Sequence, residues 1–421
     1  MRKYKYVITA IDIGTSKIKA VVGEASPDNG NINIIGYSER NTENSVIKGE
    51  IADVDKASSI LNEVAREAEK TANTILDAEN LYVSVTGSHI TSRNSSGTVI
   101  INSADHIINE KHVDEALKNA KGLRLLPSDN GLLNTIDNYF VLDDSHQVND
   151  PVGHTASKLE AKTHIVFANR NRLENFQNLV KEQGFETSTP VFSGLASCLS
   201  VLTSDDLEHT TLTINMGAGI TEYMIFDNYA VKETDILTVG CDHIANDLAL
   251  GLDISITRAR DIINSNIITL RKNEGHNNIE IKSSLKKREI PITTIEKVIE
   301  LRIIETFEAI YNKIKNKRLI KQLSNGIILA GGIAHFPNAT EIAGSIFDVP
   351  IRIGQPIDIS GPADILNDPG NITSLGLLRF GQHELSINKT KSTQGLVKRI
   401  DNKLWSAMRK IWSSATNDKN N

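Results

Sequence analysis

A glycine-rich turn near the start of the chain carries residues suited to phosphate chemistry. It follows an apolar, β-branched run and consists of Asp12, Gly14, Thr15, Ser16 and Lys17. Glycine allows backbone N–H groups to approach phosphate oxygens without an intervening Cβ. The Asp12 carboxylate could hold a hydrated Mg²⁺ ion, and the hydroxyls and the lysine add donors and a positive charge. Taken alone, such a turn is also compatible with a simple tight hairpin.

A second turn of the same kind changes that balance. The pattern of β-branched strand, polar residue, glycine turn and return strand recurs around Asn215, and 215 − 12 gives an offset of 203 positions. A duplicated βββαβα unit explains this spacing better than chance does. A third glycine turn follows the apolar run at 326–329. The candidate phosphate contacts in these two turns are Asn215, Gly217, Ala218 and Gly219, and then Gly331, Gly332 and Ile333.

The elements expected around these turns alternate between strands and helices. Helical periodicity is clear at 56–76, 110–121 and 293–314. Residues 87–163 and 242–290 interrupt the alternation and are interpreted as two insertions, the first a compact α+β module. Further helices are expected at 176–182 and 192–202, and strands at 6–13, 18–22, 32–37, 80–86, 97–101, 139–142, 159–167, 210–214, 224–226 and 326–329.

Composition excludes several classes of protein. The 421 residues predict two to four domains, and 46 basic against 52 acidic side chains give a net charge of −6. This balance argues against a polybasic nucleic-acid binder. No apolar run reaches the length of a membrane span, and no signal-peptide pattern opens the chain. The two cysteines, Cys198 and Cys241, form neither a disulfide framework nor a zinc motif, so a reducing cytoplasm is expected.

Seven segments together resemble a known superfamily. In order along the chain, they match the actin, sugar-kinase and heat-shock ATPase superfamily, and within it the FtsA family of bacterial cell-division proteins. With the basic C-terminal segment, the resemblance extends over nearly the whole chain. The segments are IDIGTSKIKAVV (11–22), VSVTGSHITSRNSSG (83–97), DPVGHTASKLE (150–160), VGCDHIANDLA (239–249), IILAGGIAHFPN (327–338), VPIRIGQP (349–356) and SLGLLRFG (374–381).

The resemblance implies an α/β fold of two actin-like βββαβα halves around a nucleotide cleft. One actin subdomain is missing, and an α+β subdomain called 1C, of the SHS2 type, is inserted into the first half. A C-terminal amphipathic helix completes the chain. The implied boundaries are 1–86, 165–192 and 372–383 for subdomain 1A, 87–164 for 1C, 193–241 and 311–371 for 2A, 242–310 for 2B, 384–393 for a linker and 394–413 for the helix.

The resemblance also implies that the three turns bind ATP, with Mg²⁺ at Asp12 and the third turn against the adenosine. The sequence departs from the family pattern at four positions. Asn215 and Glu222 stand where aspartates usually open and close the second turn, and Arg260 and Ile263 replace the Glu and Lys that face the ribose and base. An amide supplies no charge to magnesium, so we expect ATP binding without efficient hydrolysis and no catalytic residue.

The C-terminal segment is basic in an otherwise acidic chain. Between 391 and 412 it carries six basic residues and one acid, Asp401. On a helical projection the apolar residues occupy an arc of about 140°, with the cations opposite. Such a helix is suited to the interface of an anionic bilayer, although docking on the protein body is the alternative. The expected membrane-binding residues are Val397, Ile400, Leu404, Trp405, Met408, Ile411 and Trp412, with Lys398, Arg399, Lys403, Arg409 and Lys410.

The function implied is that of a non-catalytic, or at most weakly ATP-hydrolysing, cell-division protein. It would form filaments on the cytoplasmic face of the inner membrane at the division site and bind no nucleic acid. FtsZ's C-terminal peptide would dock near Asn246, Arg302 and Glu305, and later membrane proteins of the division machinery would bind 1C. The alternatives are an adaptor of a pilus machine resembling PilM, which the amphipathic tail disfavours, and a sugar or acetate kinase, which Asn215 disfavours.

Three histidines and one serine-containing segment do not fit a metal or catalytic site. His89, His154 and His164 show no helix-face ligand spacing, so structural or solvent-facing roles are expected. The segment 193–197 lacks the G-x-S-x-G elbow of hydrolases, and Cys198 is expected in the core.

Overall fold

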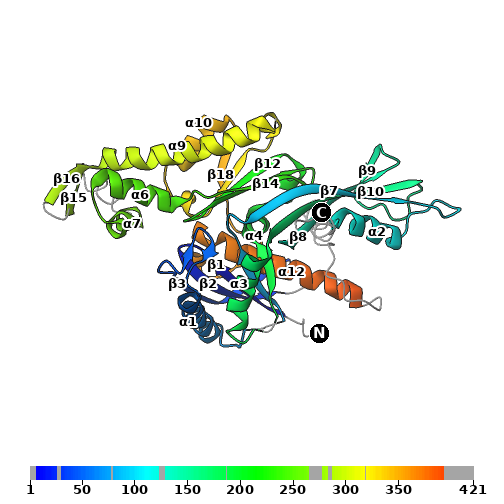
Figure 1. Cartoon of the computed structure of the whole chain (residues 1–421), viewed down its shortest axis with the longest axis horizontal. Helices are drawn as coiled ribbons and strands as arrows, with labels where there is room; N and C mark the ends of the chain where they lie inside the picture. The colour runs from blue at the N-terminus through cyan, green and yellow to red at the C-terminus, as the bar shows by residue number, and fades with distance from the viewer. Residues whose placement is uncertain are drawn as a thin grey trace, which may run out of the picture.

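The computed structural model describes residues 6–25, 30–76, 79–122, 129–185, 187–264, 277–282, 287–317 and 319–392. Figure 1 shows two central sheets, one above the other, with one extension on each side of the upper sheet. The predicted membrane-binding residues, Val397 to Trp412, lie outside the described residues. No helix in the described ranges is long and apolar enough to cross a bilayer.

The lower sheet belongs to the first half of the chain. Its central strand, β1 (Tyr6–Ile13), is almost entirely buried because its residues are apolar on both faces. β1 pairs antiparallel with β2 and parallel with β6. The strand order is β11 (Thr189–Phe192), β6 (Leu81–Val85), β1, β2 (Lys17–Ala25), β3 (Ile32–Asn41) and β19 (Ile359–Ser360).

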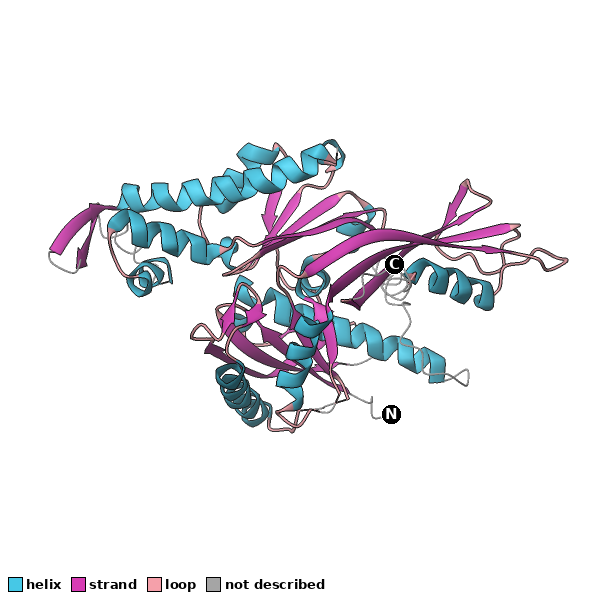
Figure 2. Cartoon of the chain, viewed as in Figure 1, coloured by secondary structure: helices cyan, strands magenta, loops and turns pink. Residues whose placement is uncertain are grey.

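The upper sheet repeats this arrangement. From β14 to β18, successive pairs are antiparallel, antiparallel, parallel and parallel, as they are from β3 to β11. Figure 2 shows the strands of the two sheets facing each other across the middle of the molecule. The predicted duplication is therefore confirmed at the level of strand order. The upper sheet consists of β14 (Ala230–Leu237), β13 (Thr221–Asp227), β12 (Thr211–Met216), β17 (Ile327–Ala330) and β18 (Ile351–Ile353).

Helices cover both sheets. α1 (Val54–Ala72) begins at Asp53, whose side chain accepts a hydrogen bond from the Lys56 N–H at 3.0 Å, and ends at Asn73 in the left-handed conformation. It stops four residues before the predicted end of 56–76. α3 (Arg170–Lys181) begins earlier than the predicted 176. The other helices around the two sheets are α4 (Ser193–Val201), α5 (Ser204–Glu208), α9 (Ile292–Asn316), α10 (Ala339–Phe347), α11 (Ala363–Leu366) and α12 (Ile372–Ser392).

α12 returns the chain to the first half. It packs on α4, β1 and β6, and Gly376 allows the closest approach, because a Cβ there would lie 1.7 Å from the Ala196 carbonyl oxygen. Arg379 is buried on this helix, where Nη1 donates to the Gly30 carbonyl at 2.9 Å and Nη2 pairs with Asp358 at 3.4 Å. The linker predicted at 384–393 is not seen, because α12 stays helical to Ser392.

The first insertion is an α+β module, as predicted. Its sheet has the order β7 (Ile90–Ile100), β10 (Lys158–Asn169), β8 (Asn130–Leu142) and β9 (His146–Val148), and α2 (Glu110–Lys121) packs on β7 and β10. The helix matches its predicted bounds, whereas β7 and β8 start earlier than expected. Gly97 lets α2 approach, because a Cβ there would lie 2.0 Å from the Ala120 nitrogen.

The module also covers the edge of the upper sheet. The Ser92 hydroxyl donates to the Thr234 carbonyl at 2.9 Å, and Asn138 exchanges two hydrogen bonds with the Val231 backbone at 3.1 and 2.9 Å. These contacts cap the backbone of β14, which would otherwise be an open edge strand. The first insertion therefore bridges the two halves on one side of the molecule.

The second insertion lies at the opposite end. It comprises α6 (Cys241–Leu252), α7 (Ile256–Asn264) and the hairpin β15 (Asn278–Lys282) and β16 (Lys287–Pro291), beside the first turns of α9 (Figure 1). α6 packs on both α7 and α9. This agrees with the predicted insertion at 242–290.

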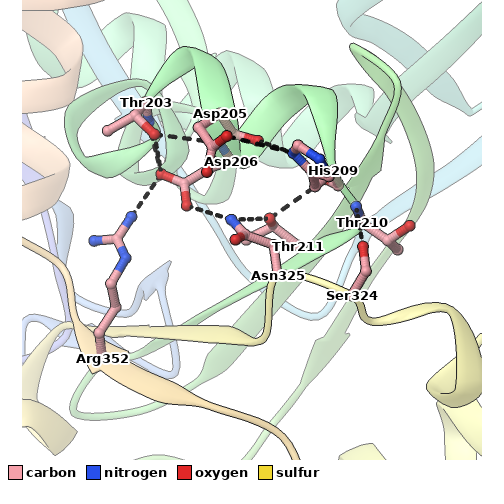
Figure 3. Close-up of polar contacts among 9 residues, drawn as sticks. All are labelled: Thr203, Asp205, Asp206, His209, Thr210, Thr211, Ser324, Asn325 and Arg352. Carbon is pink, nitrogen blue, oxygen red and sulfur yellow. Dashed lines mark hydrogen bonds and ion pairs between the residues drawn. The ribbon is translucent and has the colours of Figure 1, made fainter.

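A buried carboxylate holds three segments of the second half together. Asp206 Oδ2 accepts hydrogen bonds from the Thr203 N–H and hydroxyl at 2.8 and 2.7 Å and from Arg352 Nη2 at 2.6 Å. Its Oδ1 accepts from Asn325 Nδ2 at 2.8 Å. Figure 3 shows these groups converging on Asp206. The contacts tie α5, the approach to β17 and β18 to one another, so the cluster is structural.

Candidate nucleotide site

A cavity of about 1500 Å³ lies between the two sheets and the second insertion. The structure brings almost all of the predicted nucleotide contacts to its wall. Ile333 is the exception, because its side chain is fully buried in the core of the second half. The predicted residues that line the cavity are Asp12, Gly14, Thr15, Ser16, Lys17, Asn215, Gly217, Ala218, Gly219, Gly331 and Gly332.

The first two turns have the same backbone geometry. The Gly14 N–H donates to the Lys17 carbonyl at 3.0 Å, and the Gly217 N–H donates to the Ile220 carbonyl at 2.9 Å. Across the hairpins, Asp12 lies opposite Lys19 and Asn215 lies opposite Glu222. The duplication therefore extends to hydrogen-bond register, while the paired side chains differ in charge.

The first turn has a carboxylate facing the cavity. Ser84 donates from Oγ to Asp12 Oδ1 at 2.7 Å, and its Oγ accepts from the Ile13 N–H at 2.9 Å. Burial raises the pKa of Asp12, and the nearby Lys19 and the Ser84 hydrogen bond offset only part of that rise. Asp12 is thus held in place by the Ser84 hydroxyl and lines the cavity in a setting that favours its ionised form only in part.

Lys19 supports this turn from behind. It is 6% exposed, and its Nζ donates to the Gly370 carbonyl at 2.5 Å and to Asn371 Oδ1 at 2.7 Å. Burial lowers its pKa, with Asp12 acting in the opposite direction. Lys19 therefore joins β2 to the start of α12 beside the cavity.

Lys17 is committed to a carboxylate. It forms an ion pair with Glu39, which also accepts a hydrogen bond from the Tyr37 hydroxyl at 2.7 Å. Burial raises the pKa of Glu39, but the hydrogen bonds from Lys17 and Tyr37 outweigh it and lower the pKa overall. A ligand that attracted Lys17 would have to compete with Glu39.

The second turn rests on a buried polar network. Glu222 is 2% exposed; its Oε1 accepts from the hydroxyls of Thr86 and Ser193, and its Oε2 accepts from Asn215 Nδ2 at 3.3 Å. Asn215 Nδ2 also donates to Ser197 Oγ at 2.9 Å. Burial raises the pKa of Glu222 to about 7 despite these donors. The second turn therefore presents a neutral amide where the first presents a carboxylate.

The third turn depends on glycine. Gly331 has φ +78°, and a Cβ there would lie 2.5 Å from Asn215 Oδ1 and 2.7 Å from the Met216 carbonyl oxygen. Only glycine combines this conformation with so close a contact. The third turn is thereby held against the second.

The first two turns meet without a side chain between them. A Cβ on Gly219 would lie 2.6 Å from Thr15 Oγ1 and 2.8 Å from the Lys48 Cα. Thr15 Oγ1 accepts a hydrogen bond from the Gly49 N–H at 2.9 Å, which leaves the threonine hydroxyl proton free to be donated elsewhere. The two turns therefore meet at Thr15 and Gly219, where a Cβ would block the contact and where the Thr15 hydroxyl can donate to a phosphate oxygen.

The far wall of the cavity contains the departures from the family pattern. Arg260 and Ile263 of α7 both line the cavity. Arg260 Nε pairs with Asp242 Oδ1 at 3.3 Å. Arg260 is therefore an ion-paired residue at the wall of the cavity.

Magnesium would be held by few protein ligands here. No group of three or more His, Cys, Asp or Glu side chains in the described ranges is arranged around a metal position. Mg²⁺ commonly keeps several waters and takes one or two carboxylates plus substrate phosphates. The single carboxylate of Asp12 beside a phosphate cradle fits that mode.

Sequence reasoning missed several lining residues. Lys19, Lys48, Thr86, Ser193 and Thr373 also line the cavity. They come from strand ends, a hairpin and two helices, so only the tertiary fold brings them together. Lys19 had one available signal, since a lysine inside an apolar strand needs a partner.

His164 and Cys198, for which the sequence predicts no catalytic or metal-binding role, are buried, each with an exposed fraction of 1%. Burial lowers the pKa of His164 to about 4 and raises that of Cys198 to about 12. Both values suit neutral core residues, as expected from the sequence.

Comparison with known proteins agrees with the presence of the first insertion. Residues 212–376 match the family model of cell division protein FtsA, and residues 87–167 match the model of the SHS2 domain inserted in FtsA. Together these segments span more than half of the chain. The chain belongs to the FtsA family of cell division proteins.

Relatives within the FtsA family cover nearly the whole chain. The cell division protein FtsA of Pseudomonas aeruginosa is 29% identical, over 92% of each chain. The FtsA proteins of Neisseria meningitidis and Escherichia coli are 27% and 25% identical, over 90% and 94% of this chain and 91% and 96% of their own.

Solved structures confirm the actin-like fold. The PilM–PilN type IV pilus biogenesis complex aligns with a TM-score of 0.60 at 14% identity, over 89% of this chain and 98% of that one. MreB5 of Spiroplasma citri bound to AMPPNP aligns with a TM-score of 0.53 at 14% identity, over 92% and 99%. At such identities these likenesses establish the fold alone.

The residues predicted to meet the FtsZ peptide lie on α6 and α9. Arg302 forms a two-pronged ion pair with Asp247, with N–O distances of 2.6 and 2.9 Å, and Nη1 contacts Glu305 at 2.7 Å. Asn246 is exposed and lines the cavity instead. The structure thus groups Arg302 with Glu305, while Asn246 faces the cleft side of α6.

Proposed function

We propose that this FtsA-family chain binds Mg-ATP between its two halves and links FtsZ filaments to the cytoplasmic face of the inner membrane at the division site. The observation that carries the proposal is the double phosphate cradle, in which Thr15 and Gly219 meet with no side chain between them. Binding of nucleotide at this junction would add contacts between the two halves and so stabilise their present arrangement.

Hydrolysis by this site would be slow. A fast phosphoryl transfer needs charge that stabilises the transition state and an oriented nucleophile. Asn215 is neutral, and Glu222 is engaged by Thr86 and Ser193. ATP would therefore act mainly as a ligand that sets conformation and filament assembly.

The surface around Arg302 supports docking of the FtsZ C-terminal peptide. Two leucines beside it are unusually exposed, Leu250 on α6 at 83% and Leu301 on α9 at 53%. Leu250 lies three residues after Asp247, and Leu301 lies four residues before Glu305. Each leucine therefore shares a helix face with an acid that contacts Arg302. Apolar anchors beside a charged rim are typical of peptide-binding surfaces. Later division proteins would bind 1C.

Charge reversal tests this surface. Arg302→Glu should weaken binding of a labelled FtsZ C-terminal peptide at least about tenfold, measured by fluorescence anisotropy. Lys297→Glu on the same helix is the matched control, because Lys297 pairs with Glu300 of its own helix. Equal binding by both variants would remove this surface from the proposal.

Membrane attachment is assigned to the amphipathic segment 394–413. One chain would bind weakly, whereas a filament would bind firmly because linked helices act at high effective concentration. Filament formation and membrane binding would then reinforce each other.

Co-sedimentation with anionic liposomes tests this attachment. The full chain with Mg-ATP should pellet with vesicles, and a Trp405→Glu, Trp412→Glu variant should not. An Asn402→Glu, Ser406→Glu variant places the same two charges on the polar face of the predicted helix and should still pellet. If the tryptophan variant pellets like the full chain, the segment is not the anchor.

A further inference from the structure

The turn of a small hairpin lies at the junction of the two phosphate turns. Strands β4 (Val46–Ile47) and β5 (Glu50–Ile51) are joined by Lys48 and Gly49, which have φ +49° and +75°. Glycine, asparagine and aspartate are the usual residues at such positions. Lysine gains nothing from a left-handed backbone, and strained conformations of this kind concentrate at functional sites.

The surrounding structure holds this hairpin turn firmly. Gly49 donates its N–H to Thr15 Oγ1, and a Cβ on Gly49 would lie 2.7 Å from Thr86 Cγ2. On the other side, the Lys48 Cα would lie 2.8 Å from a Cβ on Gly219. The Lys48 backbone is therefore positioned by both phosphate turns, and its residue lines the cavity.

Among the described residues, Lys48 differs from the other cations of the cavity in its lack of an ion pair. Lys17 pairs with Glu39, and Arg260 pairs with Asp242. Lys19 is buried and its Nζ is held by Gly370 and Asn371. His335 Nε2 lies 3.1 Å from Asp368. Within the described part of the chain, Lys48 alone among these cavity-lining cations is exposed and without an ion pair or side-chain hydrogen bond.

We propose that Lys48 binds the terminal phosphate of a nucleoside triphosphate and makes the site prefer ATP to ADP. This rests on the proposed binding of nucleotide. The two turns themselves supply little net positive charge, because the first contains the acid Asp12 and Lys17 is paired with Glu39. A lysine ammonium is a compact cation suited to a phosphate oxygen. The strained backbone of Lys48 is then explained by the position that it gives the side chain.

Equilibrium binding of Mg-ATP and Mg-ADP to the full chain tests the proposal. Lys48→Ala should raise the Kd for ATP about tenfold, the size expected for one hydrogen bond to a charged group, and change the Kd for ADP less than about twofold. Lys56→Ala is the control, because Lys56 is a nearby lysine already paired with Glu43. It should change neither Kd.

A second variant separates ligand binding from folding. Lys48→Gly removes the side chain and accepts φ +49° without strain. It should lose the same preference for ATP, while its melting temperature without nucleotide stays equal to or above that of the parent chain. If both Lys48 variants keep the parent ratio of ATP to ADP affinity, or weaken both nucleotides equally, the proposal is wrong. If the parent chain binds neither nucleotide, the proposed nucleotide function falls with it.

Discussion

The two phosphate turns share a backbone and differ in charge. Each closes with a glycine N–H bonded to the carbonyl three residues later, at 3.0 and 2.9 Å. In the first, Asp12 faces Lys19 across the hairpin; in the second, Asn215 faces Glu222. The pair of the first turn is an acid and a base, and that of the second an amide and an acid.

This difference separates what phosphate binding requires from what phosphoryl transfer requires. The backbone cradle, which both turns retain, is enough to hold phosphate groups. Charge at the cavity floor is retained only in the first turn, and in the second the acid is withdrawn into a network with Thr86 and Ser193. Under the proposed function, both copies of the duplicated unit keep the turn backbone, while the second copy has no free acid for a fast reaction.

The largest effect should come from separating the turns. Gly219→Ala would place a methyl group 2.6 Å from Thr15 Oγ1 and 2.8 Å from the Lys48 Cα, so the turns must move apart. We expect ATP affinity to fall about ten- to a hundredfold, measured by calorimetry. Gly217→Ala is the comparison within the same turn, because its nearest neighbour would be at an ordinary 3.5 Å. Equal losses would mean that the junction has no special role.

Exchanging acid and amide should affect the two turns unequally. Asp12→Asn should weaken ATP binding about tenfold in the presence of Mg²⁺ and little in its absence, since the carboxylate acts through the ion. Asn215→Asp should not strengthen Mg-ATP binding, because its side chain is engaged by Ser197 and Glu222. It should instead lower the free energy of unfolding by about 1–2 kcal/mol. Strengthened Mg²⁺-dependent binding by Asn215→Asp would contradict the inferred asymmetry.

The last prediction concerns the pH dependence of stability and not nucleotide binding. The folded chain holds the Glu222 proton to about pH 7, above its ordinary pKa of 4.5. Between these values the folded state binds a proton that the unfolded state releases, so stability falls as pH rises. Glu222→Gln removes this contribution. The free energy of unfolding of the variant, relative to that of the parent chain, should therefore rise by up to about 3 kcal/mol between pH 4.5 and pH 8. Urea unfolding at the two pH values measures it; parallel pH profiles would show that Glu222 titrates normally.

The fold could be predicted where local pattern and burial agree. The buried run of β1, the 203-residue offset of the turns and the bounds of α2 followed from the sequence. β7 was predicted too short because its first residues are polar, yet Ser92 and Asn94 donate to the backbone of β14. The segment 384–392 was interpreted as a linker because it is polar, but it continues α12. The start of β7 was missed because hydrophobic periodicity carries no information on contacts between strands that are distant in sequence.

Glycine spacing predicts which turn residues the fold brings to one cavity, and that they bind nucleotide stays a prediction. The predicted residues of the three turns line the cavity except Ile333, because the short helix η3 (Gly332–His335) turns that side chain into the core. Lys48 sits between strands of two residues each, which are too short to give a pattern. Glu222 was noted as a departure, but its network depends on the register of β12 with β13 and on the position of α4.

The return of α12 to the first sheet also bears on how the chain acquires its structure. β1 and β6 are among the earliest strands in the sequence, yet they pack against residues more than 280 positions later, and β3 pairs with β19. Contacts so distant in sequence slow folding, because long loops must close before the contacts form. During synthesis, the first sheet would keep an apolar face uncovered until α12 had left the ribosome, so this half would depend most on chaperones.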